Sequence, residues 1–321
     1  MGVRNKIGVL VLIAVIIPLP FILGVWEATS YYPDVLVFTA IFSIISTGLC
    51  LLLGFAGQIS LGHAAFYGIG AYTSGILTTQ LGISPWTAAI AGMFLAGVTA
   101  YGIGVPSLRL RGHYLAMATL GFGVIVYIVF NECVTLTGGP SGFGGIPRLS
   151  LFGVPINSTI RFYYLSWFLA ILVLIVSLNT VHSRVGRALR AIHGSEIASR
   201  TLGVDAAKYK VRIFVLSAVF GALAGSLYAH FVTFINPQPF DIFFSLKLLM
   251  MVVIGGTGNV WGAFAGAGLL TFLPEWLTFL EDLDVLAYGL LLLAIVMFFP
   301  EGIIGIAGRV HALGRKLLGK A

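Results

Sequence analysis

Charged residues are scarce in this sequence: only 9% of its 321 residues are Asp, Glu, Lys or Arg, whereas 59% are hydrophobic. A soluble domain carries about 25% charged residues, so most of this chain cannot face water. The composition excludes a soluble enzyme, a nucleic-acid-binding module and a disordered chain. It predicts an all-α, polytopic helical membrane protein, because a transmembrane β-barrel would show alternating segments of about ten residues rather than long apolar runs.

Motifs with a known chemistry are also missing. The two cysteines, Cys50 and Cys133, are too few for a disulfide framework or a metal site, and both lie in apolar stretches. No G-x-x-x-x-G-K-[ST] loop is present, since the glycine-rich stretch 255–259 lacks the lysine, and neither zinc-protease nor serine-hydrolase motifs occur. We therefore expect a chain that is not an enzyme, binds no metal or cofactor and does not hydrolyse ATP itself.

Long apolar runs fill the chain instead. About 20 apolar residues cross the hydrocarbon layer of a membrane as a helix. Two candidates are weak, 61–80 because it is rich in small residues and 242–256 because it is short and contains Lys247. The sequence predicts eight transmembrane helices without these two and ten with them. The eight clear candidates are 7–25, 35–53, 85–105, 114–131, 162–181, 213–235, 260–280 and 285–300.

Basic residues indicate the orientation of these helices, since Lys and Arg are held on the cytoplasmic side. An arrangement with both termini in the cytoplasm puts most of the 18 basic residues inside and leaves acids such as Glu27, Asp34 and Asp241 outside. The net charge of +7 is therefore explained by membrane topology and requires no nucleic-acid partner.

Residues 1–321 are predicted to form a single transmembrane domain, because no linker divides them. The external loop 135–161 is dense in glycine and proline and is typical of a series of turns. The cytoplasmic loop 182–212 has seven basic residues, no proline and apolar residues at helical spacing, which predicts one or two short amphipathic helices. This loop either only fixes the topology or docks a cytoplasmic partner, and its length favours docking.

Glycine is abundant, with 41 residues in two prominent clusters. Each cluster follows an apolar run, begins as a tight turn and continues as a helix with small residues about four positions apart, a pattern that lets membrane helices approach closely. The similarity between the two clusters has two open explanations, an internal repeat of the sequence or the high glycine content alone. The candidate residues for helix packing and the translocation pathway are Gly54, Gly57, Gln58, Ser60, Gly62, His63, Tyr72, Gly255, Gly258 and Gly262.

The predicted helices hold few ionisable groups, although proton- and sodium-driven transporters usually carry such groups along their pathway. We expect Lys247 to reach the outer surface, Glu275 to lie at the membrane interface, and His63 and His230 to be hydrogen-bonded packing residues. The pattern favours a gated passage that receives its energy from another subunit.

The stretch GFAGQISLGHAAFYGIGAY at 54–72 resembles the permeases of branched-chain amino acid ABC importers, specifically the M-type subunit of the Liv system; stretches 109–121, 136–142, 186–193, 196–203 and 255–262 agree. The resemblance implies a multi-pass protein of a bacterial or archaeal plasma membrane that transports leucine, isoleucine or valine. It also implies three kinds of partner, an H-type permease, two cytoplasmic ATPase subunits that use ATP, and an extracytoplasmic substrate-binding protein.

The same resemblance makes 182–212 the segment that couples to the ATPase. Importer permeases carry E-A-A-x-x-x-G there, whereas this chain has EIASRTLG at 196–203, with one alanine replaced and the glycine one position later. A urea or short-amide importer and an autonomous secondary transporter remain alternatives, while an intramembrane enzyme lacks grouped catalytic residues. The candidate coupling residues are Arg187, Arg190, Glu196, Ala198, Arg200 and Gly203.

Overall fold

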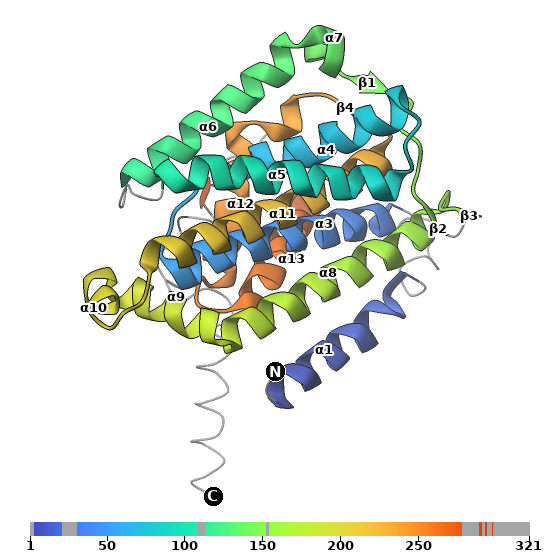
Figure 1. The fold of residues 1–321 in the computed structure, drawn as a ribbon. Helices are drawn as coiled ribbons and strands as arrows, with labels where there is room; N and C mark the ends of the chain where they lie inside the picture. The colour runs from blue at the N-terminus through green and yellow to red at the C-terminus, as the bar shows by residue number, and fades with distance from the viewer. Residues whose placement is uncertain are drawn as a thin grey trace, which may run out of the picture.

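The computed structural model of the protein describes residues 3–20, 31–107, 113–151 and 154–277, together with positions 289, 290, 293 and 297. These residues fold into a bundle of α-helices with two short pairs of strands in its loops (Figure 1), so the predicted helical membrane fold is confirmed. Its main helices are α1 (Val3–Ile16), α3 (Tyr32–Cys50), α4 (His63–Gln80), α5 (Pro85–Ser107), α6 (His113–Glu132), α8 (Thr159–His182), α9 (Arg184–Gly194), α10 (Glu196–Thr201), α11 (Ala206–Val232), α12 (Ile242–Gly255) and α13 (Val260–Leu277).

The two predicted loops lie at opposite ends of the bundle (Figure 1). The α9–α10 end, predicted to be cytoplasmic, is here called the inner end. The outer end carries α7 (Val134–Thr137), β1 (Phe143–Gly144), β2 (Ser150–Leu151) and β3 (Val154–Pro155), with β2 paired to β3. β1 pairs antiparallel with β4 (Phe234–Ile235), which ties the external loop to the segment after α11.

Among the described residues, five helical segments are long and apolar enough to cross a membrane, Tyr32–Phe55 and the helices α5, α6, α8 and α11. α12 and α13 pass the same test only as a pair, bent by 120° at the glycine turn between them. The 14 residues of α12 reach about 21 Å, which is too short to cross alone. The total of eight to ten crossings stays a prediction, because candidate 285–300 and the ends of 7–25 and 260–280 lie outside the described residues.

α12 and α13 form a hairpin that opens toward the outer end. Their connecting turn lies against the inner end of α3, where the thiol of Cys50 is 3.6 Å from the carbonyl oxygen of Thr257. α13 then returns along α3, and the rings of Tyr32 and Phe272 stack 6.2 Å apart. The second glycine cluster thus begins as a turn at the inner end, as the sequence predicted.

α4 corresponds to the weak candidate 61–80, and its surroundings explain its low hydropathy. It packs against both α11 and α5, which also contact each other, and most of its residues are buried. Because protein rather than lipid surrounds it, small residues that allow close approach matter more than apolar bulk. A Cβ atom on Gly70 would lie 2.1 Å from the carbonyl oxygen of Ala222, and one on Gly225 would lie 1.8 Å from that of Tyr67.

Replacing Gly225 by alanine is expected to destabilise the bundle by about 1–3 kcal/mol, the usual cost of forcing extra volume into a packed interior. The measurement is the midpoint of thermal unfolding of the purified protein in detergent. Gly102→Ala is the matched control, because a Cβ atom on Gly102 meets nothing within 4 Å. Its midpoint should be unchanged or slightly higher, and equal midpoints for the two variants would contradict the prediction.

Candidate functional site

The first glycine cluster lies at an irregular end of α3. This helix continues into a π-helical turn, η2 (Leu51–Phe55), and the chain then runs without regular structure to α4. π-helical turns are rare and often occur at functional sites. Gly57, just beyond the turn, has a φ angle of +65°, a left-handed conformation that strongly favours glycine.

The two glycine clusters meet in space although about 200 residues separate them. A Cβ atom on Gly54 would lie 1.6 Å from the carbonyl oxygen of Thr257, in the turn between α12 and α13. The Cys50 thiol lies 3.6 Å from the carbonyl oxygens of both Thr257 and Asn259. The inner ends of α3 and of the α12–α13 hairpin therefore form one backbone-to-backbone junction.

At most of the other predicted glycines, too, a neighbouring backbone lies too close for a side chain to fit. A Cβ atom on Gly255 would lie 1.8 Å from the carbonyl oxygen of Gly262, and one on Gly62 would lie 2.3 Å from that of Thr119 on α6. Gly258 differs, because a Cβ atom there would meet nothing within 4 Å. Gly258 is thus not required by packing within the described part of the chain.

Ser60 and His63 fix the start of α4 to α11. The buried His63 ring has its Nδ1 atom 2.9 Å from Ser60 Oγ and its Nε2 atom 2.6 Å from Ser217 Oγ. His230 of α11 is held in the same way at the outer end, between Ser74 Oγ and a backbone carbonyl of the external loop. Both histidines are therefore hydrogen-bonded inside the bundle, which is the packing role expected from the sequence.

Gln58 and Tyr72 are buried, yet their side-chain polar atoms find no hydrogen-bond partner in the described part of the chain. Tyr72 stacks on Phe130 with ring centres 4.2 Å apart and lies near β1, away from the inner turns. Gln58 lies three residues beyond the end of η2. Buried polar groups without partners are uncommon and require an explanation, so Gln58 stays a candidate pathway residue, whereas the structure does not bring Tyr72 to the same site.

The cytoplasmic loop forms two helices, α9 and α10, as predicted. Ser183 and Ser195 cap their first turns, and Asp205 caps α11, each side chain accepting a hydrogen bond from a backbone N–H group. These residue types are preferred at such positions. α9 buries Leu189 and Ile192 against the bundle, and its opposite face exposes the predicted coupling arginines, Arg187 and Arg190.

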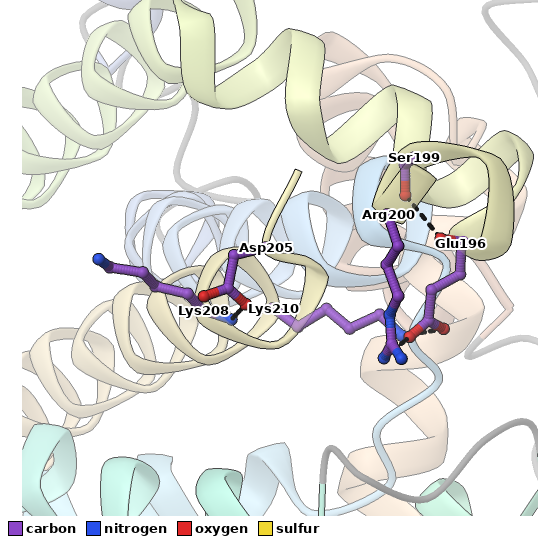
Figure 2. Close-up of polar contacts among 6 residues, drawn as sticks. All are labelled: Glu196, Ser199, Arg200, Asp205, Lys208 and Lys210. Atoms are coloured by element: carbon purple, nitrogen blue, oxygen red, sulfur yellow. Dashed lines mark hydrogen bonds and ion pairs between the residues drawn. The ribbon is translucent and has the colours of Figure 1, made fainter. Parts of the chain in front are cut away.

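Glu196, one of the predicted coupling residues, makes two ion pairs within the chain. Its Oε1 atom is 2.6 Å from Nη2 of Arg200, and its Oε2 atom is 2.9 Å from Nζ of Lys210 on α11 (Figure 2). Lys210 is buried, whereas the Arg200 side chain is 53% exposed. Glu196 therefore holds α10 onto α11, an inward contact that the sequence motif could not reveal.

The free side of α10 is apolar. Ile197 is 68% exposed and Leu202 is 82% exposed, and Ala198 between them is exposed as well. Gly203 follows with a φ angle of +81° and open space around it, so it serves the turn rather than a packing contact. Ile197 and Leu202 belong to the apolar pattern that predicted helices in this loop, but the sequence analysis did not single them out as contact residues.

His193 joins the α9–α10 segment to the glycine junction. Its Nδ1 atom lies 3.0 Å from the carbonyl oxygen of Gly54, and its Cδ2 atom would lie 3.2 Å from a Cβ atom on Gly57. The predicted coupling segment and the first glycine turn, assigned separately from the sequence, thus contact each other through His193, a side chain that the sequence analysis did not single out.

Comparison with known proteins defines the class of this permease-like bundle. The family model described as branched-chain amino acid transport system / permease component matches residues 31–299, and the chain belongs to this family. It is 31% identical to the high-affinity branched-chain amino acid transport system permease protein LivM of Escherichia coli (strain K12), over 94% of this chain and 75% of that protein. No solved structure matches the chain.

Two further relatives are more distant. The chain is 28% identical to the permease protein LivH of Escherichia coli (strain K12) and 26% identical to BraD of Pseudomonas aeruginosa, in each case over 82% of this chain and 91% of the relative. The resemblance to M-type importer permeases is confirmed, and the chain is a multi-pass membrane permease, the subunit type of an ABC importer. The two permease types among the relatives indicate a transport system of several subunits with a second permease.

Replacing Glu196 by glutamine is expected to loosen α10, because it leaves the buried ammonium of Lys210 without its counter-charge. Backbone hydrogen exchange in α10 should become faster by on the order of tenfold, since breaking a buried pair costs more than breaking an exposed one. Arg200→Ala removes only the exposed partner and should change the exchange little. Faster exchange in Arg200→Ala than in Glu196→Gln would contradict the assignment of the Glu196–Lys210 pair as the contact that holds α10.

Proposed function

We propose that this chain forms one half of the translocation pathway of an ATP-driven importer for leucine, isoleucine and valine. An H-type permease forms the other half, two cytoplasmic ATPase subunits bind and hydrolyse the ATP, and an extracytoplasmic binding protein delivers the amino acid. The complex works in the plasma membrane of a bacterium or an archaeon. The chain itself is not an enzyme and holds no cofactor or metal. The similarity to LivM, LivH and BraD, which are permease proteins of branched-chain amino acid transport systems, supports the substrate.

One observation carries the coupling role, the contact of α9 with the glycine junction through His193. Coupling between distant sites needs a chain of packed elements with two arrangements. The exposed arginines of α9 and the apolar side of α10 form a surface suited to a cytoplasmic partner. When that partner moves α9, the displacement passes through His193 to Gly54. From Gly54 it passes to Thr257 in the α12–α13 turn.

The glycine junction is built to move as a unit. No Cβ atom on Gly54 would fit beside the carbonyl oxygen of Thr257, so a shift of one backbone displaces the other directly. The π-helical turn η2 adds a second irregular element that can change its hydrogen-bonding pattern. In this mechanism closure of the ATPases pushes α9, and the junction opens or closes the inner side of the pathway.

The importer reconstituted in liposomes should accumulate leucine only when the ATPase subunits, ATP and the binding protein are all present. The permease chain alone should leave leucine at equal concentrations on both sides, because it has no energy source of its own. Uptake of radiolabelled leucine measures the accumulation by the complete importer and by the permease chain alone. Accumulation by the chain without ATPases would favour a secondary transporter, and ATP-driven uptake of urea but not of leucine would favour the urea importer.

Replacing His193 by alanine should uncouple ATP hydrolysis from uptake. We expect about tenfold fewer leucine molecules per ATP, with ATPase activity retained, because α9 loses its hydrogen bond to Gly54. His193→Asn keeps an N–H donor near the position of Nδ1 and should restore much of the coupling. The matched control is His113→Ala, an exposed histidine at the inner end of α6. Unchanged coupling in His193→Ala would remove this contact from the mechanism.

A further inference from the structure

Lys247 is a cation placed within the apolar helix α12. Its side chain is partly buried, and its ammonium lies 5.6 Å from the centre of the Phe42 ring on α3. No ion pair among the described residues includes Lys247; the pairs found there belong to Glu196. A charged group inside a membrane helix is costly and usually marks a substrate path, with a partner of opposite charge.

The surroundings of Lys247 are aromatic and partly open. Phe42 belongs to the only open stripe of α3, in which Asp34, Phe38 and Phe42 follow at intervals of four residues, while nearly all other residues of this helix are buried. The stripe runs from the outer end, where Asp34 is exposed, to the level of Lys247. On α12 itself, Phe243, one turn before Lys247, is 73% exposed.

Half-buried rings from three helices extend this stripe. Phe38 lies 5.5 Å from Phe231 and 6.2 Å from Tyr228, both on α11, and Phe42 lies 5.4 Å from Phe244 on α12 (distances between ring centres). None of the five side chains is fully buried. The aromatic patch is formed by Phe38, Phe42, Tyr228, Phe231 and Phe244.

We propose that Lys247 and the aromatic patch bind the amino acid during its passage. The Lys247 ammonium pairs with the carboxylate of the substrate, a charge-assisted contact. The rings contact the branched apolar side chain and, through their faces, the substrate ammonium. The ligand class is a zwitterionic amino acid with an apolar side chain, which supplies the missing opposite charge and fits the apolar surroundings. This inference rests on the proposed function.

The alternative is that Lys247 reaches the outer surface and contacts lipid headgroups, as long basic side chains near helix ends do. This role requires only a positive charge and does not depend on substrate. The two roles therefore differ in one respect, whether the amino acid occupies the position next to residue 247 during transport.

The test uses the complete importer with its ATPases and binding protein, and the unmodified complex must first show ATP-driven leucine uptake. Failure of that step overturns the proposed function. Lys247→Met should then lower leucine uptake at least tenfold with basal ATPase activity unchanged, and Lys247→Arg should retain most of it. Lys6→Met, an exposed lysine near the start of α1 and outside the segment 182–212, is the matched control and should transport normally. Uptake by Lys247→Met within twofold of the unmodified complex overturns the inference while the proposed function stands.

A second measurement separates substrate binding from lipid contact and from misfolding. In a Cys133→Ser background, where the other native thiol, Cys50, is buried, Lys247→Cys is treated with a methanethiosulfonate reagent that adds an ethylammonium group. The restored cation should recover uptake, and leucine transport should slow the modification severalfold. Loss of uptake that the reagent does not restore overturns the inference. Restoration without slower modification in leucine also overturns it and assigns Lys247 to the lipid surface.

Discussion

The structure depends on contacts between helix backbones that only glycine permits. Gly70 and Gly225 bring the backbones of α4 and α11 into close contact, and α11 in turn packs against α3 and α5 (Figure 1). Inside a membrane the hydrophobic effect does not drive helices together, so close packing must supply the association energy. A helix as polar as α4 is stable there because protein covers it on nearly every side.

Close packing also explains why hydroxyl and imidazole groups are tolerated at the centre. The rings of His63 and His230 each bridge α4 and α11 through serine hydroxyls, Ser217 at one level and Ser74 at another. In a medium without water, a polar group must find its partner within the protein. Two such bridges on the same helix pair fix both the rotation and the axial position of α4 against α11.

Much of this architecture could be predicted from the sequence because it depends on local patterns. The length of the apolar runs predicted the main helices, and apolar residues at helical spacing in a basic loop predicted α9 and α10. The relations between distant segments could not be predicted in this way. Neither the contact of Gly54 with Thr257 nor the inward direction of Glu196 leaves a local trace, because each depends on which backbone or cation a different helix brings near.

The π-helical turn η2 makes the number of residues in this region matter. A π turn holds one more residue than an α turn, and each residue in a helix adds about 100° of rotation and 1.5 Å of rise. Removing one residue between Leu51 and Phe55 would restore a regular α-helical turn but rotate Gly57 away from α9. The number of residues in this segment is therefore constrained as strictly as their chemistry. A deletion of a single residue would break the alignment of α3 with both α9 and the α12–α13 turn.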